Sequence, residues 1–175
     1  KEGAPDLPVS VKTRLGYNKI SFEEWIPQLL EAEPAVITLH LRTRKEMSLV
    51  PAHWESMTDI VKLVNHKALV LGNGDVMSLK DAEAKCRETG CDGVMIGRGI
   101  FGNPWMFNKE TPIENIPVAN KLSAMIEHTK IFQEKFAGIK DFAIMRKHYK
   151  AYANNFDGAK ELRAKLMTAE NSDQV

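Results

Sequence analysis

The sequence has few cysteines, almost no net charge and no long apolar run. Its 175 residues include two cysteines and carry a formal net charge of +1. Four residues separate Cys86 from Cys91, and one such pair lacks the four-ligand pattern of a structural zinc site. We therefore predict no metal site and interpret both cysteines as packing thiols in a reducing compartment.

Membrane and secretory signals are also missing from the sequence. No apolar run approaches the roughly 18 to 20 residues that a membrane-spanning helix needs. The N-terminal stretch KEGAPDLPVS has no apolar signal-peptide segment. With 43% hydrophobic residues, the chain is long enough for one sizeable core, or one core with a small appendage. We expect a cytoplasmic globular protein with no membrane partner.

Four short apolar runs occur before residue 105, and each ends in glycine or polar residues. The runs occupy residues 8–16, 35–44, 68–75 and 92–99. Helical patterns over residues 21–33, 54–66 and 78–88 separate them. This regular alternation predicts βα units with a parallel sheet.

Individual residues predict where these helices begin and end. Ser21 and Glu24 form a capping-box pattern, and Pro27 predicts a kink or a late start of the same helix. Ser78 is the expected N-cap of the third helix, and Gly90 is well placed to stop it.

The pattern of the sequence changes after the fourth apolar run. The stretch TPIENIP (111–117) is typical of a linker, and helical patterns fill the remainder. We predict three segments: an α/β domain over 1–110, a linker over 111–120 and a small all-helical domain over 121–175.

Charge is distributed unevenly along the chain. Residues 1–120 hold 14 Lys and Arg against 16 Asp and Glu, whereas residues 121–167 hold 10 against 5. A basic block on a neutral chain indicates an anionic partner such as RNA, although a solvated helix face gives the same pattern.

The four predicted strand ends carry cationic, imidazole or glycine-rich groups. These groups are Lys12 and Arg14; His40, Arg42 and Arg44; Asn73, Gly74 and Asp75; and Gly97, Arg98 and Gly99. Ligands of parallel α/β folds gather at the carboxyl ends of the strands. Glycines let backbone N–H groups approach a phosphate, and an arginine adds a charged donor. We predict a phosphate site shared by the third and fourth strand ends, where Asp75 accepts a hydrogen bond from a sugar hydroxyl.

Each of these residues also has an ordinary structural interpretation. The glycines fit plain βα turns, and His40 fits a core histidine bonded to a carbonyl group. Arg42 and Arg44 fit exposed loop charges. The coincidence of all four strand ends on one rim favours the phosphate site, because independent turns would not share this composition.

The motifs VSVKTRLGY, ITLHLRTR, LGNGDVMS, DGVMIGRGIFGNPWMF, MRKHYKAY and GAKELRAKL follow one another in this order. Over residues 8–167 the series resembles the tRNA-dihydrouridine synthase family. The resemblance implies an α/β fold, namely the second half (four βα units) of a TIM (β/α)₈ barrel, followed by a small all-helical domain that binds tRNA. It also implies FMN as cofactor, NADPH as reductant and reduction of uridine to dihydrouridine in tRNA.

The resemblance implies roles for thirteen residues. The expected cofactor-binding residues are Lys12 and His40 near the flavin ring, Asn73, Gly74 and Asp75 near the ribityl phosphate, and Gly97 and Arg98 at the phosphate. The expected RNA-binding residues are Arg14, Arg42, Arg44, Arg146, Lys147 and His148.

Two features depart from the family pattern. The proton-donating cysteine of the family lies in an Asn-x-Gly-Cys-Pro motif, which this sequence lacks. Cys86 and Cys91 fall on a helix and at the wrong end of a strand, so we predict no catalytic residue in this chain. Four βα units are only half a barrel, which predicts a C-terminal fragment of a longer protein or a shortened relative. A smaller departure is Leu41, where the family commonly has glycine.

A half barrel exposes sheet edges and apolar lining, so we expect a partner, either the missing N-terminal half or a second copy. We also expect little or no flavin on this chain alone. Two other functions stay open: a non-catalytic RNA-binding or assembly module derived from such an enzyme, and a flavin oxidoreductase that acts on a small molecule.

Overall fold

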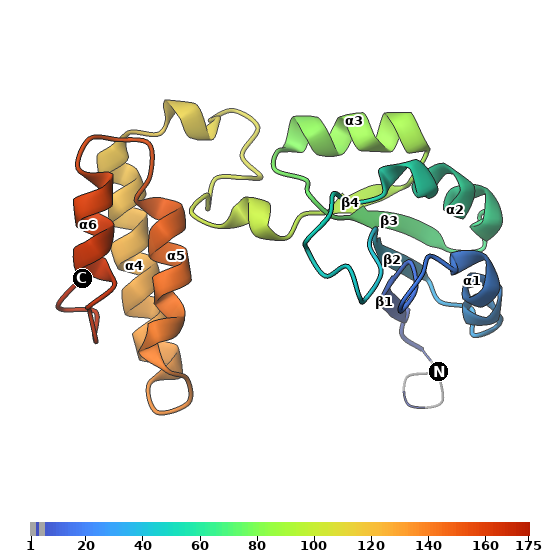
Figure 1. Cartoon of the computed structure of the whole chain (residues 1–175), viewed down its shortest axis with the longest axis horizontal. Helices are drawn as coiled ribbons and strands as arrows, with labels where there is room; N and C mark the ends of the chain where they lie inside the picture. The colour runs from blue at the N-terminus through green and yellow to red at the C-terminus, as the bar shows by residue number, and fades with distance from the viewer. Residues whose placement is uncertain (1–2, 4–5) are drawn as a thin grey trace. The chain divides into compact units, whose positions relative to one another are not determined.

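A computed structural model describes residue 3 and residues 6–175 (Figure 1). The chain divides into two compact units, residues 1–99 and 100–175. The second unit therefore begins before the predicted linker and includes it.

The first unit is built on a parallel sheet in which the strands follow the order β1-β2-β3-β4. The strands are β1 (Ser10–Arg14), β2 (Val36–His40), β3 (Leu69–Asn73) and β4 (Gly93–Met95). Sequential order and parallel pairing are what successive βα units produce. The predicted α/β class is confirmed, and the sheet is consistent with part of a (β/α)₈ barrel.

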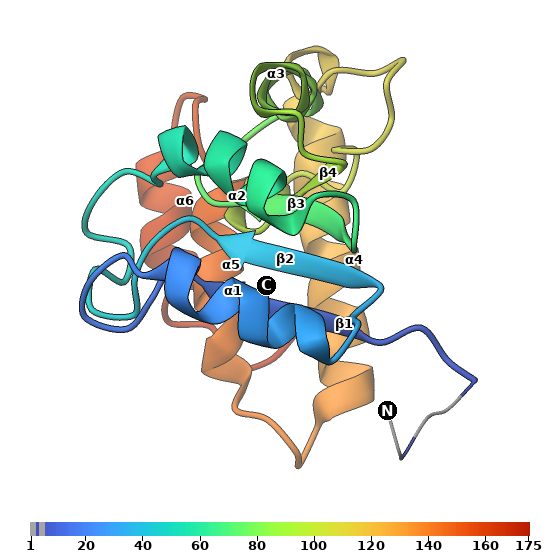
Figure 2. The ribbon, with the colours of Figure 1, turned by 90° about the vertical axis from the view of Figure 1, so that its right-hand side faces the viewer.

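Three helices pack on one face of this sheet (Figures 1 and 2). They are α1 (Phe22–Glu31), α2 (Met57–Val64) and α3 (Leu79–Thr89). The core includes Ile37 and Leu39 from β2, Ile26 from α1 and Ile60 from α2, each fully buried. Leu41 is also fully buried in this core.

The opposite sheet face presents two rows of side chains. Strand register aligns Arg14, His40, Asn73 and Met95 in one row. A second row consists of Lys12, Thr38, Leu71 and Gly93. Because side chains alternate along a strand, both rows face away from the helices that cover the core residues.

The predicted helix signals are confirmed for α3 and partly wrong for α1. Ser78 Oγ accepts a hydrogen bond from Asp81 N at 3.1 Å, and Gly90 ends the helix at φ +76°. Ser21 makes no side-chain cap bond, so the capping box is wrong. Pro27 lies inside α1, which begins at Phe22, so a late start is also wrong.

The fourth βα unit is shorter than expected. Strand β4 has three residues and is followed by the 3₁₀ helix η2 (Arg98–Ile100). Gly99 allows the loops to approach closely, because a Cβ there would lie 2.7 Å from Val76 O. Of the four strands, only the first three are followed by an α-helix inside the first unit.

The regular elements described in residues 100–175 are helical. They are η2, which begins at Arg98, η3 (Ile113–Asn115), α4 (Val118–Phe136), η4 (Phe142–Met145), α5 (Arg146–Tyr152) and α6 (Ala159–Leu166). Their core centres on Met125, Met145, Tyr149 and Leu166. Thr129 is fully buried beside them and donates to Met125 O at 2.8 Å.

Membrane-spanning helices and metal-binding clusters are both absent from the described residues. None of the helices is long and apolar enough to cross a membrane. No group of three or more His, Cys, Asp or Glu side chains is arranged to hold a metal ion within the same part of the chain.

Candidate anion-binding site

The carboxyl ends of the four strands surround a cavity of about 300 Å³ in the first unit. Eight of the predicted site residues line it: Arg14, His40, Arg42, Asn73, Gly74, Asp75, Gly97 and Arg98. The cavity therefore contains three guanidinium groups and one carboxylate, a net of two positive charges if His40 is neutral. Such a surplus is suited to an anionic ligand.

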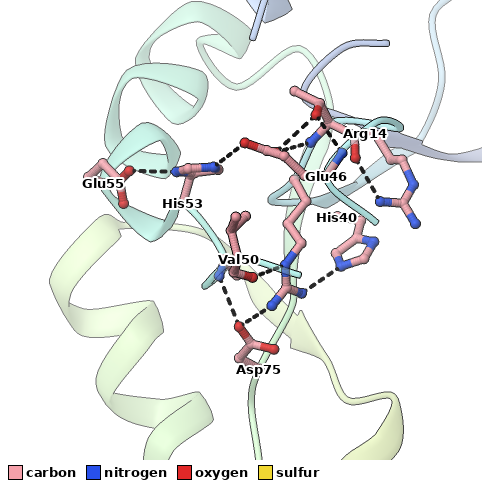
Figure 3. A network of polar contacts seen from close by, with 10 residues as sticks. Arg14, His40, Glu46, Val50, His53, Glu55 and Asp75 are labelled. Carbon is pink, nitrogen blue, oxygen red and sulfur yellow. Dashed lines mark hydrogen bonds and ion pairs between the residues drawn. The ribbon is translucent and has the colours of Figure 1, made fainter. Parts of the chain in front are cut away.

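Arg42 is the centre of a polar network beside this cavity, and Figure 3 labels its partners His40, Val50 and Asp75. Its Nε donates to Val50 O at 2.6 Å, and its Nη1 donates to His40 Nε2 at 3.2 Å. Its Nη2 bonds to Asp75 Oδ2. The Arg42 side chain is 3% exposed. The expectation that Arg42 faces RNA is thus corrected: the guanidinium is enclosed and holds neighbouring groups in place.

Asp75 connects three segments of the first unit. Its Oδ2 also accepts from Ala52 N at 2.9 Å, and its Oδ1 accepts from Arg98 Nη2 at 3.2 Å. The hydrogen bond from Arg42 is the main reason why the pKa of Asp75 is lowered. Asp75 adopts φ +54°, a left-handed conformation that Asp tolerates better than most residues. Oδ1 accepts one of these bonds and the Asp75 side chain is 36% exposed, so the carboxylate keeps acceptor capacity and its hydrogen bond to a sugar stays a prediction.

His40 is neutral at physiological pH. Burial, followed by the charges of Arg14, Lys12 and Arg42, lowers its pKa to about 4. Arginine can only donate, so His40 Nε2 accepts the bond from Arg42 and the proton resides on Nδ1. His40 can therefore offer an Nδ1–H donor to a ligand.

A second polar network fastens the loop between β2 and α2 (Figure 3). Glu46 Oε2 accepts from Thr43 N at 2.7 Å and from Thr43 Oγ1 at 3.0 Å. His53 lies between two carboxylates, with Glu46 Oε1 at 2.9 Å and Glu55 Oε1 at 3.0 Å. The hydrogen bond with Glu46 is the main cause that raises the pKa of His53. These residues were not predicted as site residues, and only their spacing along one loop could have suggested them.

The glycines near the site differ in the space that a Cβ atom would have at each position. A Cβ at Gly72 would lie 2.4 Å from the Trp54 ring, so Gly72 makes room for that side chain. Trp54 Nε1 donates to Gly74 O at 2.9 Å. A Cβ at Gly97 would meet nothing closer than 4.0 Å, so its backbone borders open space in the cavity. Asn73 Nδ2 donates to Met95 O at 2.8 Å, which joins the ends of β3 and β4.

Lys12 and Arg44 line a neighbouring open cavity that shares Arg14. Burial and the charge of Arg14 lower the pKa of Lys12. Arg14 Nη1 donates to Thr43 O at 3.1 Å, whereas Arg44 is exposed and lies 5.9 Å from the Tyr17 ring centroid. Of these residues, Arg44 is freest to meet a large ligand.

Arg146, Lys147 and His148 lie on α5 of the second unit. Arg146 and Lys147 are exposed, as the RNA-binding expectation requires. His148 is half-buried between the rings of Phe101 and His128, each with a centroid 4.9 Å away. Burial is the main cause that lowers its pKa. His148 thus packs against two rings, and its predicted contact with RNA stays a prediction.

A family model described as dihydrouridine synthase matches residues 2–175. The chain belongs to the dihydrouridine synthase family. The resemblance noted in the sequence is thereby confirmed.

Curated relatives of this dihydrouridine synthase family chain agree with the match. A probable tRNA-dihydrouridine synthase of Staphylococcus aureus is 41% identical over 96% of this chain and 52% of that protein. Probable tRNA-dihydrouridine synthase 2 of Bacillus subtilis is 38% identical over 98% of this chain and 54% of that protein. The chain spans about half the length of the curated relatives it matches.

Proposed function

We propose that this chain is the C-terminal portion of a flavin-dependent enzyme that reduces uridine to 5,6-dihydrouridine in tRNA. In this proposal FMN is the cofactor, NADPH is the reductant, tRNA is the substrate and the cytoplasm is the location. The cationic cavity at the strand ends is the observation that carries the proposal, because a dinucleotide or mononucleotide cofactor needs such a site for its phosphate.

The cavity suits the phosphate of FMN in charge and in shape. A phosphate monoester is close to dianionic at neutral pH, which matches the net of two positive charges around the cavity. Arg98 is 63% exposed and has only one hydrogen bond to Asp75 Oδ1, so its other donors can reach a phosphate. The open backbone at Gly97 lets the ligand approach the chain.

The residues of this chain would bind and orient the ligands. Bound FMN supplies the hydride-transfer chemistry. Lys12 and the neutral His40 lie on the sheet face opposite the helices, where they can hydrogen-bond polar groups of a flavin ring. Arg42 and Asp75 fix the positions of His40 and Arg98. Arg14, Arg44, Arg146 and Lys147 are the proposed contacts to RNA phosphates.

The proton donor would come from outside this chain. Cys91 precedes β4, so it lies at the amino end of the strands, away from the cavity. Cys86 Sγ is 3.9 Å from Cys91 Sγ, and burial is the main cause that raises the pKa of Cys86. We propose that the N-terminal half of the barrel completes the site, with closure by a second copy as the alternative.

A second candidate function is a non-catalytic RNA-binding or assembly module. It is favoured by one observation: no cysteine of the described residues lines the cavity. Formation of dihydrouridine in unmodified tRNA by the gene product, with NADPH and FMN, would rule this candidate out.

Flavin binding tests the proposed phosphate site directly. FMN and riboflavin differ by the phosphate, so flavin fluorescence titrations with both ligands isolate its contribution. We expect weak binding by this chain, a preference for FMN over riboflavin, and loss of that preference in Arg98→Ala. The matched control is Arg87→Ala, an exposed arginine on α3 that does not line the cavity. Equal FMN preference in the two variants would refute the assignment, and stoichiometric flavin on the purified chain would refute the need for a second half.

A further inference from the structure

Cys86 and Cys91 lie side by side in the first unit. Their Sγ atoms are 3.9 Å apart. Cys86 belongs to the last full turn of α3, and Cys91 lies between this helix and β4. The pair is therefore near the amino end of the sheet, and neither thiol lines the candidate anion-binding site at the carboxyl end.

The way in which α3 ends brings the two thiols together. Gly90 follows the helix at φ +76°, and its N–H donates to Cys86 O at 2.9 Å. At helix ends of this kind, the residue after the left-handed one frequently packs against the residue whose carbonyl accepts the bond. Cys91 and Cys86 occupy these two positions, so their contact follows from the fold of the helix end.

Cys91 is the fixed member of the pair. It is 6% exposed, and its Sγ lies 3.3 Å from Gly93 O as a donor. The next residue, Asp92, joins Val70 twice, because Asp92 N donates to Val70 O at 2.9 Å and Asp92 Oδ2 accepts from Val70 N at 2.7 Å. Cys86 is half-buried near a helix end, so a reagent in solution reaches it before it reaches Cys91.

The separation of the sulfur atoms is small enough for a disulfide bond to form. A disulfide joins two sulfur atoms at about 2.05 Å. At 3.9 Å the two thiols are already in contact, so rotation of the Cys86 side chain can bring them to bonding distance. The helix does not have to leave the sheet for this step.

We propose that Cys86 and Cys91 are a reversible oxidation site, whose disulfide fastens the last turn of α3 to the segment that leads into β4. The inference is independent of the proposed function. A neighbouring thiol lets oxidation of a cysteine stop at a disulfide, which other thiols can reduce again. A solitary cysteine can instead proceed to acids that are not reduced.

The reaction requires an oxidant, and a low-molecular-weight disulfide is the class that we propose. The Cys86 thiolate attacks one sulfur of the reagent, which releases the other as a thiol and leaves a mixed disulfide on Cys86. Cys91 then loses its proton and attacks Cys86 Sγ, which breaks the bond to the reagent and releases the second reagent thiol. The two cysteines together lose two electrons and two protons, and the reagent gains both.

This exchange should be slow at neutral pH. Burial, followed by the neighbouring Cys91, raises the pKa of Cys86, and the charges of Asp92 and Glu83 act in the same direction. Because the thiolate is the attacking species, the rate of oxidation should increase as pH rises above neutrality.

The test exposes the whole reduced chain to graded ratios of hydroxyethyl disulfide and its thiol, and then blocks the remaining thiols with iodoacetamide. Intact mass should show that both alkylation sites are lost together and that no reagent stays attached. Trypsin cleaves after Arg87, so a disulfide between Cys86 and Cys91 should join two tryptic peptides.

Two magnitudes test whether the fold promotes this bond. The equilibrium constant for oxidation should be about tenfold or more larger for the folded chain than for the chain in concentrated urea. By the same linkage, oxidation should raise the thermal midpoint of the first unit by about 4 to 8 °C.

Single replacements separate the two steps of the exchange. Cys91→Ala keeps the attacking thiol and removes the resolving one, so a mixed disulfide should persist on Cys86. Cys86→Ser leaves only the buried Cys91, which the reagent should modify much more slowly in the folded chain. The measurements on the unaltered chain test the proposal even if a replacement prevents folding.

Three results would overturn the proposal. A mixed disulfide that persists on Cys86 of the unaltered chain would show that Cys91 cannot reach it. Equal equilibrium constants for the folded and unfolded chains would show that the fold does not bring the thiols together. A lower thermal midpoint after oxidation would show that the bond distorts the helix end and does not fasten it.

Discussion

Replacement of Arg42 by methionine should destabilise the first unit without leaving a large cavity. The Arg42 side chain is 3% exposed and donates to Val50 O, His40 Nε2 and Asp75 Oδ2. Methionine has similar length and flexibility, so the variant removes the donors while much of the packing is retained.

The magnitude follows from the groups that lose a donor. The charge-assisted bond to Asp75 contributes about 1.5 to 3 kcal/mol, and the lower half applies because Asp75 is 36% exposed and can rehydrate. The Val50 carbonyl adds about 1 kcal/mol when it loses its donor. We expect a total loss of about 2 to 4 kcal/mol in the free energy of unfolding, near the values for a broken buried ion pair.

Urea unfolding followed by tryptophan fluorescence measures this loss. Trp54 donates to Gly74 O beside the site, so it reports on the first unit. Arg44→Met is the control, because Arg44 is exposed and its change should stay within about 0.5 kcal/mol. In a double-mutant cycle, Arg42→Met should lower the free energy of unfolding by less in the Asp75→Asn background, because the carboxylate is already gone. Equal unfolding midpoints and slopes for the two arginine variants would show that Arg42 does not organise the site.

Two further predictions concern residues around the same site. Gly72→Ala should cost about 1 to 3 kcal/mol, because its Cβ would clash with the Trp54 ring, whereas Gly97→Ala has space for a Cβ and should leave the urea midpoint unchanged. His53 has a raised pKa through Glu46, so its contribution to stability is full below about pH 6.5 and is lost as pH rises through its folded-state pKa. The difference in unfolding free energy between the unaltered chain and His53→Gln should therefore shrink above pH 6.5; a difference that grows with pH would contradict this assignment.

The fold was predictable where local signals and tertiary packing agree. Residues 68–75 were expected to form a strand and β3 covers Leu69–Asn73, where Val70 is buried in the core and the backbone pairs with β2 and β4. Ser78 caps α3 because its extended backbone directs the hydroxyl to Asp81 N. Ser21 has the same residue type but adopts ψ 30°, and its side chain makes no cap bond. The pattern alone does not determine that backbone angle.

The gathering of these side chains at one edge of the sheet was predictable, but the bonds among them were not. Parallel strands bring Arg14, His40 and Asn73 into one row, so their proximity follows from register. The burial of Arg42 depends on Asp75, which lies 33 residues further along the chain, and on the loop that carries Val50. No local periodicity encodes such a contact, and so Arg42 was expected at the surface.

The presence of a carboxylate in the proposed phosphate site has a physical explanation in this geometry. Asp75 Oδ2 engages Arg42 and Ala52 N, while Oδ1 engages Arg98, so one negative charge restrains two guanidinium groups and a loop. Without it, the cations of the cavity would repel one another and would have to be ordered by the ligand. Ordering mobile side chains on binding costs free energy, and Asp75 lowers this cost because it already restrains them. Asp75 can therefore strengthen phosphate binding although its own charge repels the phosphate. Asp75→Asn therefore separates two effects: weaker FMN binding would show that positioning dominates, and stronger binding would show that charge repulsion does.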